Sequence, residues 1–325
     1  MQVPNTAIQA GDQLDHYRLD SVVALSGMAT VFRATDLNTG TQVAIKVPHP
    51  EMESDPVLYD RFQREQDIGT RMQHPGVMKV LPNPDRSQVY MVMEWLDGRL
   101  LRTIMNEEKP LPMERAVRIT IGICEALEYI HSQGVVHRDL KPENVMVTAN
   151  DEIRLIDFGI AANAGARRLT FANFSQSMGT PDYISPEQVK GQRGDQRSDI
   201  YSLGAMLYEM LAGEPPFTGS NPLAVMNERL LNDPEPVRKL RNEVSPELEE
   251  ILKRALEREP RNRYQTASEM AWELEHPEMV GVEEPERRPV VGGITLPRVR
   301  KLVFYAALVL TPIFIFLLMV ILAKR

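Results

Sequence analysis

The first part of the chain, residues 17–95, is patterned for β-structure. Short apolar runs there alternate with polar positions, and this period of two is typical of strands with one buried face. An Asn-Thr-Gly turn at residues 38–40 separates two of the runs. The pattern predicts strands at residues 22–25, 30–34, 41–47 and 89–93.

Residues 112–275 are patterned for helices instead. Apolar side chains recur every three or four residues between 116 and 130, and Gly134 ends that predicted helix. A second helix is predicted over residues 198–211, and a third after a capping-box pattern that begins at Thr266. A small sheet followed by a larger helical mass predicts the α+β class, with two lobes and a cleft between them.

The last part of the chain is patterned for a membrane. Residues 276–297 are rich in Pro, Glu, Arg and Gly, which predicts a flexible juxtamembrane linker. Residues 302–322 form a run of 21 residues without a charge, and as a helix this run spans roughly 30 Å of hydrocarbon. A buried core helix is the alternative, but such helices seldom run this long without a polar face. We therefore expect residues 298–325 to be a single-pass C-terminal anchor in a lipid bilayer.

The start of the chain predicts where its main body lies. Residues 1–16 have neither the basic start nor the apolar core of a secretory signal, so we expect a short N-terminal tail and a cytoplasmic body.

Charge and cysteine content exclude some function classes. Residues 276–325 hold 7 Lys and Arg against 4 Asp and Glu, which leaves 30 against 41 in residues 1–275. Such an acidic body argues against a nucleic-acid partner. A single cysteine, Cys124, excludes an internal disulfide framework and a cysteine-based zinc cluster.

One lysine stands out in the strand-rich part. In the predicted strand 41–47 a period of two places Ala44 and Lys46 on one face and the three β-branched residues on the other. A lysine within an apolar strand is unfavourable unless an anion meets it. Taken alone, Lys46 is better explained as an edge lysine whose ammonium reaches solvent.

Two motifs farther along change that interpretation. Residues 137–144 have the sequence His-Arg-Asp-Leu-Lys-Pro-Glu-Asn, and residues 155–159 have the sequence Leu-Ile-Asp-Phe-Gly. In both segments the chain resembles the protein kinase family, and the resemblance covers about residues 17–275. It implies a bilobal fold, with a β-rich N-lobe at about residues 17–95 and an α-helical C-lobe at about residues 96–275.

The resemblance implies a set of residues for the chemical step. Phosphoryl transfer depends mainly on placement and on cations that neutralise the phosphate oxygens. By resemblance, Asp139 orients and deprotonates the attacking hydroxyl, and Lys141 contacts the γ-phosphate. Asn144 and Asp157 would hold Mg²⁺, with Mn²⁺ as an alternative.

The resemblance also implies an ATP site. Lys46 would contact the α- and β-phosphates, and Glu65 would be its helix partner; Glu51, Glu53 and Asp67 are nearby acids that could take this place instead. The hinge that binds the base would be Glu94 to Leu96. The other residues implied for the nucleotide are Ala24, Ser26, Gly27, Val31, Ala44 and Met93.

The phosphate loop departs from the family pattern. Ala24, Ser26 and Ala29 stand where the family has glycines, and only Gly27 remains, between them. Side chains at these positions stiffen the loop and strain a backbone that glycine occupies freely. A pseudokinase, which binds nucleotide or recruits partners at the membrane, therefore stays open as the alternative.

The remaining motifs favour a serine/threonine protein kinase. Lys141 and the sequence Gly-Thr-Pro-Asp-Tyr-Ile-Ser-Pro-Glu at residues 179–187 are typical of that class and disfavour a small-molecule phosphotransferase. By resemblance, Thr180 lines the substrate pocket, Glu187 pairs with Arg263, and Asp199 anchors the catalytic loop.

The segment before Gly179 resembles an activation loop. We expect autophosphorylation there, with Arg138 receiving the phosphate and Thr170, Ser175, Ser177 and Thr180 as unranked candidates. The expected partners are ATP, protein substrates and the lipid bilayer; self-association is left open.

Overall fold

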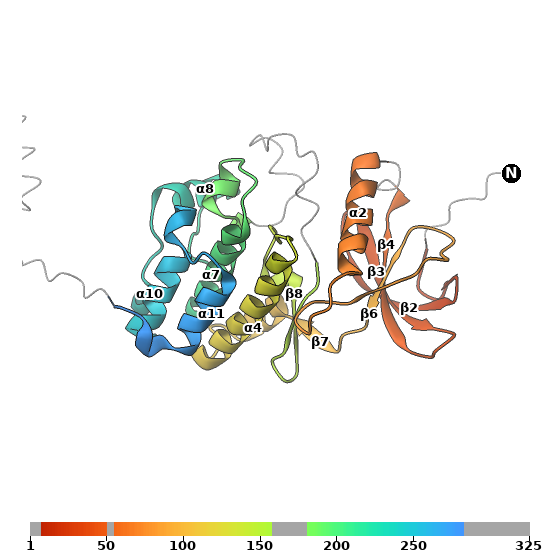
Figure 1. Cartoon of the computed structure of the whole chain (residues 1–325), viewed down its shortest axis with the longest axis horizontal. Helices are drawn as coiled ribbons and strands as arrows, with labels where there is room; N and C mark the ends of the chain where they lie inside the picture. Colours follow the sequence, from red (N-terminus) through yellow and green to blue (C-terminus); the bar gives the residue numbers. More distant parts are fainter. Residues whose placement is uncertain (1–7, 51–54, 158–180, 283–325) are drawn as a thin grey trace, which may run out of the picture. The chain divides into compact units, whose positions relative to one another are not determined.

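A computed structural model describes residues 8–50, 55–157 and 181–282 of the chain. These residues form a β-rich N-terminal lobe and a helical C-terminal lobe, which belong to one compact unit (Figure 1). The predicted bilobal α+β fold is confirmed.

The N-terminal lobe is built on one antiparallel sheet. Its strands lie in the order β1-β2-β3-β4-β6-β5. Their bounds are Gln13–Leu14 (β1), Tyr17–Leu25 (β2), Ala29–Asp36 (β3), Gln42–Pro48 (β4), Val80–Leu81 (β5) and Met91–Glu94 (β6). The predicted strands correspond to β2, β3, β4 and β6, while β1 and β5 are too short to show a period in the sequence.

One helix packs against this sheet. Helix α2 (Pro56–Gly69) begins at Asp55, whose carboxylate accepts hydrogen bonds from the first turn. Its Phe62 is buried in a cluster with Ala44 and Met93 of the sheet. This packing fixes the face of α2 that carries Glu65, three residues and so nearly one turn beyond Phe62.

The C-terminal lobe is organised around two long helices. Helix α7 (Gln196–Ala212) is buried along nearly its whole length, and α4 (Met113–Ser132) packs beside it. Both end close to the predicted stops, because Gly134 and Gly213 adopt the left-handed conformation there. The predicted helix after Thr266 is α11 (Ala267–Glu275), which packs on α4.

Shorter elements complete the lobe. A second antiparallel sheet has the order β7-β8-β9. Its strands are Gly98–Leu100 (β7), Val145–Thr148 (β8) and Ile153–Leu155 (β9). The other helices are Leu101–Glu107 (α3), Pro186–Val189 (α6), Pro222–Leu231 (α8), Val237–Leu240 (α9) and Pro246–Ala255 (α10). The 3₁₀ turns are Pro142–Asn144 (η1), Pro181–Tyr183 (η4), Pro260–Asn262 (η5) and Pro277–Met279 (η6).

Within residues 8–50, 55–157 and 181–282, no helix has both the length and the apolar character needed to cross a bilayer. The predicted anchor, residues 298–325, lies outside the described residues.

Candidate active site

Lys46 joins the two lobes. It lies on β4 opposite Val31 of β3, and its ammonium nitrogen is 2.8 Å from Glu65 Oε1 and 2.9 Å from Asp157 Oδ1. Its side chain is only 17% exposed. The structure therefore places Glu65, among the acids considered for this role, against Lys46.

The charges of Lys46, Glu65 and Asp157 do not balance, because one ammonium group faces two carboxyl groups. Burial favours the neutral form of Lys46, but the adjacent charges of Glu65 and Asp157 outweigh it and raise the pKa of Lys46. Burial raises the pKa of Glu65, and Lys46 only partly offsets it. Burial would also raise the pKa of Asp157, yet Lys46 and a hydrogen bond with Glu65 hold it below its usual range. Of the two carboxyl groups, Asp157 is therefore the more readily ionised.

The catalytic loop brings three predicted residues together. Lys141 Nζ donates to Asp139 Oδ2 at 2.7 Å, and Asn144 Nδ2 donates to the Asp139 carbonyl oxygen at 2.7 Å. The Asp139 side chain is about half exposed, at 54%, whereas Asn144 is buried. Asp139 is therefore held from two sides and still open to an incoming hydroxyl group.

Asn144 and Asp157 suit a divalent cation. The Asn144 amide nitrogen is bound to a carbonyl oxygen, which only accepts, so its amide oxygen is left for a metal. Ile156, next to Asp157, donates its backbone N–H to the Asn144 carbonyl at 3.0 Å, so the two segments lie side by side. Within the described ranges no group of three or more His, Cys, Asp and Glu side chains could hold a metal ion. Two protein oxygens completed by phosphate and water suit Mg²⁺.

Asp199 holds the backbone of the catalytic loop. Its carboxylate is fully buried on α7 and accepts from the backbone N–H groups of His137 and Arg138, at 2.8 and 2.7 Å. It also binds the imidazole Nε2 of His131 at 2.7 Å. Arg138 has a φ of +63°, a left-handed conformation that disfavours a residue with a side chain. Asp199 thus stabilises a strained backbone beside Asp139, in the anchoring position that we expected.

The predicted base site is an apolar surface between β3, β4 and the hinge. Met93 and Ala44 are buried and pair across β6 and β4. Val31 and Leu96 are half-buried against the same cluster. The carboxylate of Glu94 accepts from the backbone nitrogen of Lys79 at 2.9 Å, so this side chain is engaged within its own lobe.

Ile156 also belongs to this surface, and it was not predicted from the sequence. Ile156 packs against the cluster of Ala44 and Met93 although it comes from the segment after β9. Its place directly before Asp157 was the available signal.

The phosphate loop is held by a side chain. Ser26 follows β2, and its hydroxyl accepts from the backbone N–H groups of Met28 and Ala29, at 3.3 and 3.0 Å. It also donates to the Ala29 carbonyl oxygen at 2.9 Å. Ala24 pairs with Val31 across β2 and β3, and a side chain added at Gly27 would meet nothing within 4 Å. Two backbone donors of the loop are therefore bound internally by Ser26.

The ion pair expected between Glu187 and Arg263 is present. Arg263 donates to both carboxylate oxygens of Glu187, at 2.8 and 2.7 Å, and both side chains are buried. Ser198 donates a third hydrogen bond to Glu187 at 2.6 Å. Several residues named in the sequence analysis lie outside the described part of the chain: Glu51, Glu53, Phe158, Gly159, Thr170, Ser175, Ser177, Gly179 and Thr180.

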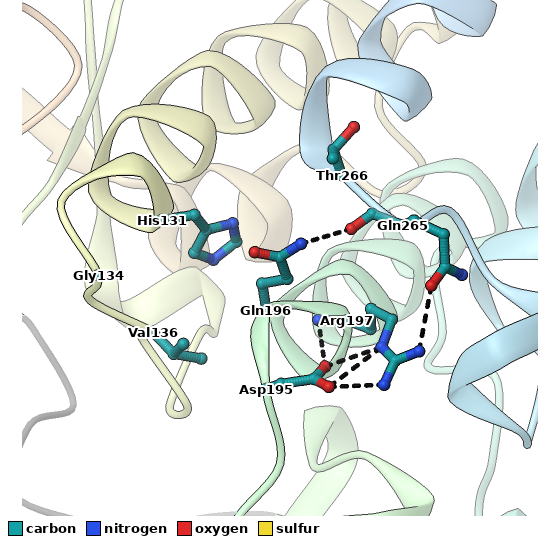
Figure 2. A pocket seen from close by; sticks show the side chains of 8 residues that line it. All are labelled: His131, Gly134, Val136, Asp195, Gln196, Arg197, Gln265 and Thr266. Atoms are coloured by element: carbon teal, nitrogen blue, oxygen red, sulfur yellow. Dashed lines mark hydrogen bonds and ion pairs between the residues drawn. The ribbon is translucent and has the colours of Figure 1, made fainter.

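A cavity of about 400 Å³ is lined by residues from the end of α4, the start of α7 and the segment before α11 (Figure 2). His131 and Val136 form one wall, and the ion pair of Asp195 and Arg197 forms another. Arg197 donates in turn to Gln265 at 3.1 Å. None of the predicted catalytic or nucleotide-binding residues lines this cavity, so it is not the candidate active site.

Together the bilobal fold, the buried Lys46 between two carboxylates and the Asp139 loop define the class of the protein kinases. Comparison with known families agrees: the model of the protein kinase domain matches residues 25–275. The chain belongs to the protein kinase family.

Bacterial serine/threonine protein kinases are among its relatives. The chain is 39% identical over 265 residues to "Serine/threonine-protein kinase PknB" of Mycolicibacterium smegmatis, covering 80% of this chain and 42% of that protein. It is 37% identical over 269 residues to "Probable serine/threonine-protein kinase PknB" of Corynebacterium glutamicum, with the same two coverages. The chain thus spans about two fifths of the length of these curated relatives. Among solved structures, the Mycobacterium tuberculosis PknI kinase domain matches 83% of this chain and 100% of its own length, with a TM-score of 0.65 and 28% identity.

Proposed function

We propose that the chain is a serine/threonine protein kinase that transfers the γ-phosphate of ATP to Ser and Thr hydroxyls of protein substrates. The observation that carries the proposal is the double ion pair of Lys46 with Glu65 and Asp157. It spans both lobes, and it holds a cation against Asp157, the proposed metal ligand. The names of the bacterial relatives support the same class of substrate.

Each residue has a distinct part in this proposal. Asp139, open to solvent, orients the substrate hydroxyl and accepts its proton. Lys141, 2.7 Å from Asp139, neutralises charge on the transferred phosphoryl group. Asn144 and Asp157 hold Mg²⁺, which when bound neutralises the phosphate oxygens and fixes their position. Lys46, positioned by Glu65, binds the α- and β-phosphates.

The nucleotide base would lie against the apolar surface described above. Val31, Ala44 and Met93 supply its contact area, and the backbone of Glu94 to Leu96 supplies its hydrogen bonds. Ala24, Ser26 and Gly27 cover the phosphates in this proposal. No charged group of the chemical step is missing, so the altered loop affects the strength of nucleotide binding rather than the reaction.

The proposal is tested by measuring the transfer of labelled phosphate from Mg²⁺-ATP to a generic protein substrate. The full chain in detergent is the enzyme in this assay. We expect Asp139→Asn and Asp157→Ala each to lower transfer by at least about 100-fold. Asp67→Asn, on the exposed face of α2, is the matched control and should behave as wild type. Undiminished transfer by both variants would mean that a contaminant is active. No transfer by wild type, despite measured ATP binding, would instead establish the pseudokinase.

We also propose that residues 298–325 anchor the protein in a membrane, with the kinase domain in the cytoplasm. The support is the uncharged run at residues 302–322 with basic residues on both sides. Deleting residues 298–325 should move the protein from the membrane fraction to the supernatant. Deleting only residues 283–297, the part of the predicted linker that follows the described residues, should leave it with the membranes. A chain that still sediments without residues 298–325 would disprove the anchor.

Autophosphorylation is the third part of the proposal. Burial and nearby Arg193 lower the pKa of Arg138, and its Nε has no hydrogen-bond partner among the described residues, so this guanidinium is suited to an added anion. Thr170, Ser175, Ser177 and Thr180 are the candidate acceptors. Mass spectrometry of wild type and of Asp139→Asn after incubation with ATP identifies the acceptor. Equal modification of both would show that another kinase had added the phosphate.

A further inference from the structure

A second charged cluster lies beside the catalytic loop and takes no part in the chemistry above. At its centre is Arg102 of α3, which donates from Nε to Glu143 Oε1 and from Nη1 to Glu209 Oε1, both at 2.8 Å. A third hydrogen bond runs from Nη2 to the hydroxyl of Tyr183, and that hydroxyl donates to the other oxygen of Glu209. Arg102 also lies over the Tyr183 ring, 5.6 Å from its centroid.

The cluster lies next to the place where a substrate would bind. Glu143 belongs to η1, between Lys141 and Asn144, and its side chain is 44% exposed. Tyr183 belongs to η4, which follows Thr180, the predicted lining of the substrate pocket. Both acids of the cluster are thus tied to segments that carry the proposed chemistry.

The groups around Arg102 form a receptor for one guanidinium. Two carboxylates and a tyrosine hydroxyl converge on it from three segments, and a planar guanidinium suits such an arrangement better than an ammonium. Glu209 is only 8% exposed and Arg102 only 22%, so the charge of Glu209 needs a cation close by. Burial would lower the pKa of Arg102, but the hydrogen bond to Glu209 and the other contacts outweigh it and raise that pKa. Arg102 therefore remains charged.

We propose that Arg102 is a built-in cation that fills a guanidinium subsite beside the phospho-acceptor position, and so makes substrate choice indifferent to basic residues. With Arg102 in place, its guanidinium occupies the position between Glu143 and Glu209, so that an arginine of the substrate cannot enter there. Without it, the same two acids become a receptor for a substrate arginine. Arg102 is thus a specificity-determining residue, and this inference rests on the proposed protein kinase function.

The experiment compares matched peptides that carry one serine in a neutral sequence. Arginine or glutamine is placed in turn at each of the four positions on either side of the serine. Both kcat/KM for phosphate transfer and affinity by fluorescence anisotropy are measured. For wild type we expect the arginine and glutamine peptides to agree within about twofold at every position. For Arg102→Met we expect an arginine preference of at least about tenfold at one position, in both measurements.

Two further variants separate this role from a structural one. Arg102→Met combined with Glu209→Gln should lose the new preference, because the receptor then has one charge less. Arg99→Met is the matched control, since Arg99 pairs with Glu107 on an exposed surface, and it should keep the wild-type indifference. Melting temperatures show which variants fold. If Arg102→Met does not fold, Arg102→Gln is used instead, because the glutamine amide can still donate a hydrogen bond to Glu209.

The outcomes distinguish the inference from the proposed function. A wild type that already prefers arginine at least tenfold, or a folded Arg102 variant that gains no preference, overturns the inference. If no form transfers phosphate but Arg102→Met gains affinity for an arginine peptide, the inference stands and the proposed function fails.

Discussion

Asp199 accepts a 2.7 Å hydrogen bond from the backbone nitrogen of Arg138, a residue 61 positions earlier whose φ of +63° it stabilises. The second oxygen of the carboxylate accepts from the backbone of His137 at 2.8 Å. Helix α7, which is buried along nearly its whole length, thereby sets the backbone on which Asp139 lies. The backbone conformation beside Asp139, the proposed catalytic carboxylate, is thus set by the core of the C-terminal lobe.

Replacing Asp199 by Asn should damage both stability and transfer. An amide offers one acceptor oxygen where the carboxylate offers two, and its NH₂ group faces a backbone donor. We expect a loss of about 2–4 kcal/mol and a melting temperature lower by about 5–10 °C. Transfer by the fraction that remains folded should fall at least about tenfold. Asp233→Asn, at an exposed ion pair with Arg258, is the control for both measurements. A variant that melts like wild type would show that the loop does not depend on this carboxylate.

Replacing Lys46 by Met tests the link between the lobes. The change removes the only cation that the structure places between Glu65 and Asp157, so two carboxylates are left facing each other. We expect transfer to fall at least about 100-fold and ATP affinity to weaken. Phosphate transfer and equilibrium ATP binding are the measurements, with Lys79→Met, at an exposed position, as the control. Near-normal transfer by Lys46→Met would contradict the role proposed for the ion pair.

How well the sequence predicted each residue of this site depends on how far apart in the chain the contacting residues lie. Asp139, Asn144 and Asp157 lie in two short contiguous motifs, and the period of two placed Lys46 on the face of its strand that it occupies. The acid that pairs with Lys46 was harder to predict, because four acids lie close to one another in that part of the sequence. Only the packing of Phe62 against Ala44 and Met93 determines which face of α2 lies toward the sheet.

Other contacts left no trace in the local pattern. Arg102 meets Glu209 across 107 residues and Tyr183 across 81, and nothing in the sequence around α3 marks it as more than a surface arginine. The hydrogen bonds of the Ser26 hydroxyl depend on the geometry of one turn. The presence of serine in place of glycine does not by itself predict that geometry. Such contacts are set by tertiary packing and not by periodicity.

Replacing Ser26 by Gly should strengthen nucleotide binding. The hydroxyl now binds the N–H groups of Met28 and Ala29, and its removal frees both donors for the phosphates and loosens the turn. We expect KM for ATP to fall about 3–10-fold with kcat changed by less than about twofold. Ser21→Gly, at an exposed position in β2, the strand that precedes Ser26, controls for the flexibility of an added glycine. An unchanged or higher KM in Ser26→Gly would show that the serine preorganises the loop for ATP.

The buried pair of Glu187 and Arg263 should make stability depend on pH. Burial would raise the pKa of Glu187, but the hydrogen bonds and charge of Arg263 outweigh it and lower that pKa below its usual 4.5. The stabilisation from the charged carboxylate is therefore complete above about pH 4.5, and it is lost as the pH falls through the lowered pKa of the folded state.

Glu187→Gln tests this dependence directly. At about pH 7 the change leaves the fully buried Arg263 without its anion and should cost about 3–5 kcal/mol in urea unfolding. Well below pH 4.5 the wild-type carboxyl is neutral too, so the two proteins should converge. Gln188→Ala on the same helix α6 serves as a control, because its loss should not vary with pH in this range. A difference between wild type and Glu187→Gln that stays constant from about pH 7 to well below pH 4.5 would show that the charge of Glu187 does not stabilise the fold.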